Sequence, residues 1–209
     1  MAAASKLKNK KETDARKEKL QRDAKDRILL QINEYTKALK SAAAWHNSED
    51  SIAYVKNKDN DQKGVNYIYE FYCYIRVVSE LQHNYKCKYK PGKGKEPHKF
   101  PQAASYKKDK PRFDIYEGDN HKFQVCAGTK IKGKYSVEKD HPDISFQIAS
   151  ANEEQPTLDD LIMIFDAKFQ LDETSKLDKG EVDKFESIVR RFQLNKLITE
   201  KISFRKEFE

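Results

Sequence analysis

Residues 161–169 have the sequence LIMIFDAKF, in which five apolar residues are followed by an acid and, two positions later, a lysine. The apolar run predicts a buried β-strand. Because side chains alternate between the two faces of a strand, Asp166 and Lys168 would share one face, with their backbones about 6.7 Å apart. Burial of either charge alone is costly, so the pair needs a compensating partner, a metal ion or a water-filled cleft. The segment therefore indicates a functional site or, as the alternative, a structural ion pair.

A second predicted strand lies upstream and begins beside another acid. Pro142 and Asp143 precede the apolar segment 144–148. Proline is tolerated at the first position of a strand but not in the middle of a central one, so Asp143 would lie at the mouth of this strand. His141 comes just before the pair and could contact a phosphate or a metal, although a lone histidine is more often structural.

Other segments carry the patterns of helices and of a hairpin. Residues 6–40 contain neither Pro nor Gly, and their apolar stripe is confined to the second half. Residues 65–82 are apolar almost all round, which predicts a helix that packs against a sheet. A further helical stripe covers residues 181–199, after a polar loop. Segments 113–116 and 122–126 predict two strands joined by a turn through Gly118, Asp119 and Asn120.

The predicted helix 65–82 contains two acids, Glu70 and Glu80. Glu70 lies in the middle of the helix and shares a face with Tyr67 and Tyr74, so we expect it in or beside the core. Glu80 lies near the helix end, where a solvated glutamate is ordinary. We therefore take Glu70 as the candidate site residue, with Glu80 as the alternative.

Length and composition restrict the class of protein. The 209 residues suffice for one domain with a core and a helical extension. Cys73, Cys87 and Cys126 form no C-x-x-C motif for zinc or redox chemistry, which predicts buried, reduced thiols. No apolar run approaches the ~20 residues that span a bilayer, and the N-terminus lacks the apolar block of a signal peptide. We expect a cytoplasmic protein that does not associate with a membrane.

Positive charge is concentrated in residues 84–112, which we predict to be a basic loop. Nine lysines and one arginine against two acids give this segment +8, whereas the whole chain carries +7. It also contains Tyr85, Tyr89, Phe100 and Tyr106, whose rings could stack on bases. This composition is typical of a surface that binds nucleic acid, and the alternative is a solvated loop that keeps the protein soluble. The candidate nucleic-acid-binding lysines are Lys86, Lys88, Lys90, Lys93, Lys95, Lys107, Lys108 and Lys110.

Taken together, Pro142-Asp143, Asp166-Ala167-Lys168 and an earlier helical Glu70 resemble the motif of the PD-(D/E)XK nuclease superfamily. Tyr69-Glu70-Phe71-Tyr72 and Phe165–Phe169 look like the nuclease subunit of McrBC-type modification-dependent restriction systems. The resemblance covers residues 65–200. It implies an α/β (α+β) fold with a restriction-endonuclease-like core, in which helices flank a mixed central β-sheet. The predicted domains are a charged helical extension, 1–47, and a nuclease-like domain, 48–209.

The resemblance also implies a metal-dependent endonuclease that hydrolyses phosphodiester bonds in DNA, as part of a restriction or defence system. Phosphodiester hydrolysis needs an oriented water and neutralisation of developing charge, and a divalent cation serves both needs. Magnesium (or manganese) would be held by Asp143, Asp166, the backbone carbonyl of Ala167 and Glu70. Lys168 would orient the attacking water, help deprotonate it or stabilise the phosphate charge, and Gln170 would hold the substrate or a water.

Two alternatives remain open at the level of the sequence. One is a nuclease-fold module that binds nucleic acid or assembles a complex without cutting it, and the other is a nuclease that acts on RNA. Sequence or modification specificity would come from a motor or recognition subunit if the McrBC resemblance holds. Double-strand cutting needs two active sites, so a homodimer is a further expectation.

Overall fold

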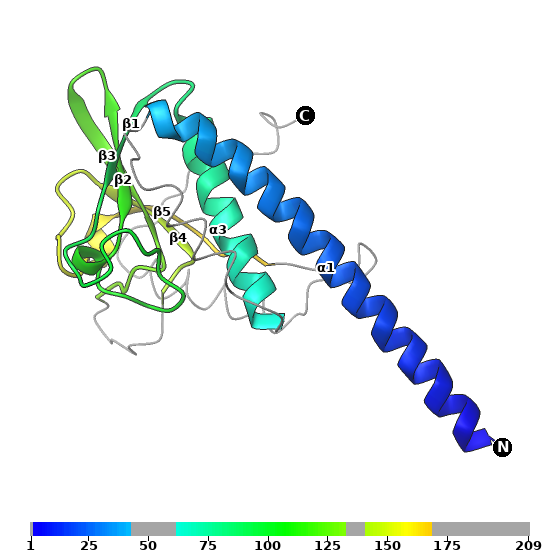
Figure 1. The fold of residues 1–209 in the computed structure, drawn as a ribbon. Coiled ribbons are helices and arrows are strands. Elements are labelled where there is room, and N and C mark those ends of the chain that lie inside the picture. Colours follow the sequence, from blue (N-terminus) through cyan, green and yellow to red (C-terminus); the bar gives the residue numbers. More distant parts are fainter. Residues whose placement is uncertain (1, 43–61, 133–140, 169–209) are drawn as a thin grey trace, which may run out of the picture. The chain divides into compact units, whose positions relative to one another are not determined.

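A computed structural model of the chain describes residues 2–42, 62–132 and 141–168 (Figure 1). The helix predicted at 181–199, most of the polar segment before helix 65–82, and Gln170 lie outside the described residues. None of the described helices is long and apolar enough to cross a bilayer. The described elements are helices α1 (Ala2–Ala42) and α3 (Gln62–Leu81), strands β1 (Lys86–Lys90), β2 (Arg112–Glu117), β3 (Asn120–Ala127), β4 (Ile144–Ile148) and β5 (Leu161–Phe165), and one-turn helices η1 (Lys107–Asp109) and η2 (Leu158–Asp160).

The five described strands form one antiparallel sheet in the order β1-β2-β3-β4-β5, so neighbours in the chain are neighbours in the sheet. The fold is thus mixed α+β, as predicted, and the hairpin β2–β3 is confirmed. The expected mixture of parallel and antiparallel pairs is not found among these strands. A parallel pair needs a crossover connection, usually a helix, whereas the described connections contain only loops and one-turn helices.

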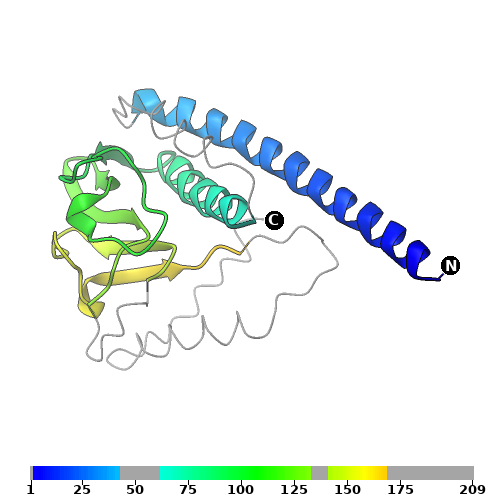
Figure 2. The same cartoon turned by 60° about the horizontal axis from the view of Figure 1, so that its bottom comes forward.

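Helix α3 packs between α1 and one face of the sheet (Figure 2). Its predicted apolar character is confirmed, since Ile68, Tyr74, Ile75 and Val78 are fully buried. The sheet packs against α3 through the apolar side chains of alternate residues, because a strand presents every second residue to the same face. The sheet residues of this core are Cys87, Phe113, Ile115, Val125, Ile144 and Phe146.

Among the α1 side chains that the structure describes, only those in the second half of the helix contribute to the core. Ile28, Ile32 and Leu39 are buried against α3, and the ring of Tyr35 lies 6.1 Å from that of Tyr72. Residues 12–19 are exposed. The predicted division into a charged first half and a packed second half is confirmed.

The opposite face of the sheet carries a layer of buried polar side chains. Arg112, Asp114, Gln124 and Gln147 are each at most 7% exposed. The Arg112 guanidinium donates to Asp114 Oδ1 at 3.0 Å and to Glu153 Oε1 at 2.7 Å. The loop 149–157 and η1 cover this layer: Gln124 donates to the Ala149 carbonyl, and Lys107 to the Ala151 carbonyl.

Two sequence predictions about strands need correction. The segment 84–112 is not a loop throughout, because β1 pairs with β2 and turns Cys87 inward while its lysines face away from α3. Strand β5 ends at Phe165 and lies at the edge of the described sheet, where Ile162 is 45% exposed. An apolar run therefore does not make β5 a fully buried strand. Only one of its faces, with Met163 and Phe165, packs on the core.

Gly92 lies where the chain after β1 passes close to η1. A Cβ atom at Gly92 would lie 2.4 Å from the carbonyl oxygen of Asp109 and 2.7 Å from the amide nitrogen of Lys110. These backbone atoms cannot rotate away, so we expect Gly92→Ala to lower the free energy of unfolding by about 1–3 kcal/mol in urea denaturation. Gly94→Ala is the matched control, since its Cβ would lie 3.2 Å from the same oxygen and should cost less. Equal stability of Gly92→Ala and wild type would contradict this close packing.

Candidate active site

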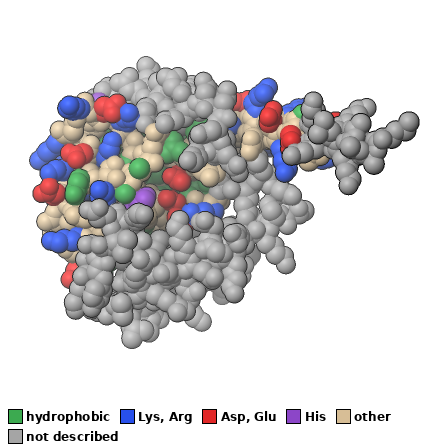
Figure 3. All heavy atoms as spheres, turned by 90° about the horizontal axis from the view of Figure 1, so that it is seen from below, with side chains coloured by type: hydrophobic (Ala, Val, Ile, Leu, Met, Phe, Trp, Pro, Cys, Tyr) green, Lys and Arg blue, Asp and Glu red, His purple; other side chains and the backbone are tan. Residues whose placement is uncertain are grey.

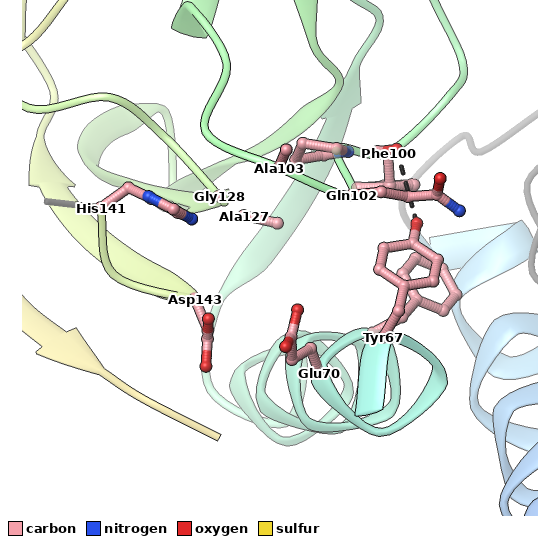
Figure 4. Close-up of a pocket in the computed structure, with 11 residues that line it drawn as sticks. Tyr67, Glu70, Phe100, Gln102, Ala103, Ala127, Gly128, His141 and Asp143 are labelled. Carbon is pink, nitrogen blue, oxygen red and sulfur yellow. Dashed lines mark hydrogen bonds between the residues drawn. The ribbon is translucent and has the colours of Figure 1, made fainter. Parts of the chain in front are cut away.

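A pocket of about 120 Å³ opens between α3, the segment before η1 and the start of β4 (Figure 4). Glu70 enters it from α3, and His141 and Asp143 enter it from the segment that leads into β4. In Figure 4 the Glu70 and Asp143 side chains lie next to each other at one wall. The other lining residues are Tyr67, Phe71, Phe100, Pro101, Gln102, Ala103, Ala127 and Gly128.

Asp143 is held by backbone amides from two other parts of the chain. The Gly128 N–H, just after β3, donates to the Asp143 carbonyl at 2.9 Å. The Ala167 N–H, just after β5, donates to the Asp143 carboxylate at 2.7 Å. Gly128 has φ +51°, a conformation that glycine adopts without strain. The two motifs predicted from sequence thus meet through a direct hydrogen bond.

Asp166 and Lys168 lie together beside Asp143. The Lys168 ammonium contacts the Asp166 carboxylate at 2.8 Å, and the two side chains are 30% and 16% exposed. Asp166 lies close enough to Asp143 to raise the pKa of the Asp143 carboxyl through hydrogen bonding and through its charge. Their common orientation agrees with the alternation argued from sequence, although both residues follow the end of β5.

Burial and like charges raise the pKa values of two of these acids. Burial raises the pKa of Glu70 to about 7; the Lys168 charge opposes this rise and the Asp166 charge adds to it. The pKa of Asp143 is raised well above its usual range by burial first, then by the hydrogen bond with Asp166 and the negative charges of Glu70 and Asp166. The Ala167 N–H partly offsets this effect. Both acids therefore keep their protons to a higher pH than an ordinary carboxyl group does.

The donor set fits a divalent cation bound through two carboxylates. No group of three or more His, Cys, Asp or Glu side chains within 2–42, 62–132 and 141–168 has the arrangement of a complete metal-binding cluster. Magnesium, however, is usually held by one or two carboxylates with water and substrate phosphate. Asp143 and Asp166 could supply those two carboxylates, and a bound cation would oppose the burial and like charges that raise the pKa of Asp143.

The structure distributes the predicted nucleic-acid-binding lysines over different environments. Lys90 pairs with Glu153 at 3.8 Å, and Lys108 pairs with Glu154. Lys107 is only 2% exposed and donates to the Ala151 carbonyl, so it cannot contact a nucleic acid outside the protein. Figure 3 shows acidic side chains beside a histidine on one face, with Lys and Arg side chains on the neighbouring surface. The exposed predicted lysines are Lys86, Lys88, Lys93 and Lys95, and Lys110 is half-buried.

Some residues of the pocket were not predicted from the sequence. Residues 100–103 belong to the basic segment, yet they form one wall, and the Gln102 Nε2 is buried there with no hydrogen-bond partner among the described residues. Gly128 fixes the backbone of Asp143, a role that a single glycine after a predicted strand does not reveal. Ala167, predicted to offer its carbonyl to a metal, contributes its N–H to Asp143.

Comparison with known proteins adds no information about the site. No family model, curated protein or solved structure matched the chain.

The raised pKa of Glu70 predicts that the metal-free protein loses stability as the pH rises. The unfolded glutamate ionises near 4.5 and the folded one near 7, so the folded state binds more protons between these values. The cost of ionising Glu70 is absent below pH 4.5, grows through this window and is complete above pH 7. We expect Glu70→Gln to raise the free energy of unfolding at pH 8 by up to about 3 kcal/mol and to have no such effect at pH 4.5.

Urea denaturation in EDTA from pH 4.5 to 8 measures this difference. Glu80→Gln is the matched control, because Glu80 is exposed on the same helix and its replacement should leave the pH profile unchanged. A profile of Glu70→Gln that runs parallel to that of wild type would show that burial of Glu70 carries no such cost.

Proposed function

We propose that this protein is a metal-dependent endonuclease of the PD-(D/E)XK superfamily that hydrolyses phosphodiester bonds in DNA. The observation that carries the proposal is the 2.7 Å hydrogen bond from the Ala167 N–H to the Asp143 carboxylate. It joins the Pro-Asp motif to the Asp-x-Lys motif. Glu70, the third acid of the motif, lines the same pocket as Asp143.

The arrangement of elements supports a restriction-endonuclease-like core. The three acids come from α3, from the residue before β4 and from the residue after β5, and α3 packs on the apolar face of the sheet. A chance Asp-x-Lys sequence would not place its backbone in a hydrogen bond with the acid of a Pro-Asp sequence at the start of the neighbouring strand.

Each polar residue of the site has a role in the proposed reaction. Asp143 and Asp166 would hold magnesium or manganese, and Glu70 would contribute through a water molecule. A bound divalent cation would lower the pKa of an attacking water and stabilise the charge that develops on the phosphate. Lys168, held by Asp166 at 2.8 Å, would orient that water or donate to a phosphate oxygen. Glu70, with a pKa of about 7, can accept or release a proton near neutral pH.

A role in a restriction or defence system belongs to the same proposal and rests on the likeness to McrBC-type nuclease subunits. In such a system a motor or recognition partner would select the DNA. Two copies of this chain would supply the two active sites that a double-strand break needs.

A cleavage assay tests the proposal directly. The full chain is incubated with supercoiled plasmid, linear duplex DNA, single-stranded DNA and RNA, each with magnesium, with manganese or with EDTA. We expect DNA cleavage with either metal and none with EDTA. Binding without cleavage under every metal condition would replace the proposal with a non-catalytic binding module, and cleavage of RNA alone would change the substrate class.

A further inference from the structure

A second, open groove of about 510 Å³ is lined in part by residues that directly follow segment 100–103 of the acid pocket in the chain. We name it the Tyr106 groove; segments 94–96, 104–106 and 109–110 and Lys130 form it. Tyr106 is 40% exposed there. The Lys130 ammonium lies 4.8 Å from the centre of its ring, and the Lys108 ammonium lies 5.9 Å from it. The groove thus offers an accessible aromatic ring flanked by positive charge.

Tyr106 differs in this respect from the other rings of the basic segment. Phe100 is 2% exposed, the Tyr85 ring packs on Phe123, and the Tyr89 ring packs between Phe113 and His98. These three rings belong to the core or pack against it. Tyr106 is the ring of this segment that the structure leaves available for stacking.

The charges that line the groove favour an anionic ligand. Lys95 and Lys110 form no ion pair with any residue in the part of the chain that the structure describes, and Lys130 faces the Tyr106 ring. Of the two acids, Glu96 is engaged by Lys99, which contacts both of its carboxylate oxygens at 2.9 Å. Asp109 is the other. The groove retains an excess of positive charge.

The backbone around Tyr106 is fixed, which lowers the entropic cost of using its ring as a binding platform. The Asp109 N–H donates to the Tyr106 carbonyl at 3.1 Å as the first turn of η1 forms. The next residue, Lys107, is anchored in the protein by its backbone N–H to Glu154 and by its ammonium to Ala151. The buried Lys107 is therefore not available to bind a nucleic acid, but its anchoring helps to hold the neighbouring Tyr106 in place.

The groove and the acid pocket share one wall. The Ser105 N–H donates to the Gly128 carbonyl at 3.0 Å, and the Lys130 N–H donates to the Ser105 carbonyl at 2.9 Å. Gly128 lines the acid pocket, whereas Ser105 and Lys130 line the groove. A polymer bound in the Tyr106 groove therefore lies close to the acid pocket.

We propose that the Tyr106 groove binds single-stranded nucleic acid by stacking an unpaired base on Tyr106, while Lys95, Lys110 and Lys130 contact the neighbouring phosphates. The inference rests on the proposed function for its ligand class and adds to it that the strand next to the acid pocket is unpaired. Inside a duplex the bases are stacked on one another, so only its two end pairs present a free base face to the ring.

Binding in EDTA tests this inference separately from cleavage. The probes are a fluorescein-labelled single-stranded DNA oligonucleotide, the same sequence as a blunt duplex, and an abasic oligonucleotide of equal length. Tyr106→Ala should weaken binding of the single strand by about five- to a hundredfold, the range that loss of one stacked base produces. Tyr106→Phe keeps the ring and should remain within about twofold of wild type.

Tyr116→Ala is the matched control. The Lys88 ammonium lies 4.2 Å from the centre of the Tyr116 ring, so this variant removes a similar lysine-flanked ring outside the groove. It should bind the single strand as wild type does. Thermal unfolding followed by circular dichroism confirms that each variant is folded.

The outcomes separate stacking from simple charge attraction. Loss of affinity for the single strand alone, with the duplex and the abasic oligonucleotide unaffected, supports the proposal. An equal loss on all three probes, or no loss on the single strand, overturns it. The binding assay contains no divalent metal, so its result is independent of cleavage. If the wild-type chain cleaves DNA and Tyr106→Ala binds the single strand as wild type does, the proposed role of the Tyr106 groove is wrong while the proposed function stands.

Discussion

Replacing Asp166 with asparagine is expected to reduce metal-dependent DNA cleavage at least about a hundredfold, because it removes a carboxylate that would hold the cation and the partner of Lys168. The substitution keeps the size of the side chain. It removes the charge that contacts the Lys168 ammonium at 2.8 Å and that helps to raise the pKa of Asp143. The initial rate of plasmid nicking in magnesium measures the effect.

A control variant distinguishes the specific effect of losing Asp166 from the general effect of losing one acidic residue. Asp159, exposed in η2 shortly before β5, is the matched control, and Asp159→Asn should cleave as wild type does. Lys168→Ala should show a loss similar to that of Asp166→Asn, since the two side chains form one unit. If Asp166→Asn and wild type, purified in the same way, nick plasmid at equal rates, the assigned active site is wrong.

The second large effect is expected on stability. Arg112→Met should lower the free energy of unfolding by about 3–5 kcal/mol, because it leaves buried acidic charge without its partner. The Arg112 side chain is 4% exposed, and that of Asp114, which it contacts at 3.0 Å, is 10% exposed. Methionine fills most of the same space, so the loss reflects the uncompensated Asp114 charge more than a cavity. Urea denaturation at pH 7 measures it.

An exposed ion pair on the same hairpin supplies the control. Lys122 contacts Glu117 at 3.1 Å with both side chains at least 41% exposed, so Lys122→Met should cost less than about 1 kcal/mol. Adding Asp114→Asn to Arg112→Met should recover part of the loss, because the unpaired charge is then gone. A double variant no more stable than Arg112→Met would assign the effect to packing instead.

Sequence periodicity was sufficient to predict the two described α-helices and the central hairpin. The stripe in the second half of α1 and the nearly all-apolar α3 are patterns in which each residue's burial follows from its spacing along a helix. The turn through Gly118, which has φ +60°, is a local property of the same kind. The proximity of Asp143 and Asp166 could be anticipated because both lie at the ends of strands that pair with one another.

The features missed from the sequence depend on contacts between distant segments. Lysines are rarely buried, so composition placed Lys107 at the surface, whereas its ammonium finds the Ala151 carbonyl under the 149–157 loop. Strand β1 has lysines at alternate positions, and only pairing with β2 makes that segment a strand. Residues 100–103 are held as a pocket wall by the isolated β-bridge between Ser105 and Thr129, and no local sequence pattern predicts this contact.

The strand order of the sheet follows the chain, but the acids of the pocket come from segments far apart in it. Strands β2, β3 and β4 pair through nearby segments, which closes small loops at little entropic cost. Glu70 and Asp166 approach each other only when α3 and the residues after β5 are both in place. Losing the residues after β5 to truncation or proteolysis leaves the strands their pairing partners and α3 its core contacts, but it removes Asp166 from the site. A shortened chain thus keeps much of the architecture and basic charge of this protein without the means to perform its proposed chemistry.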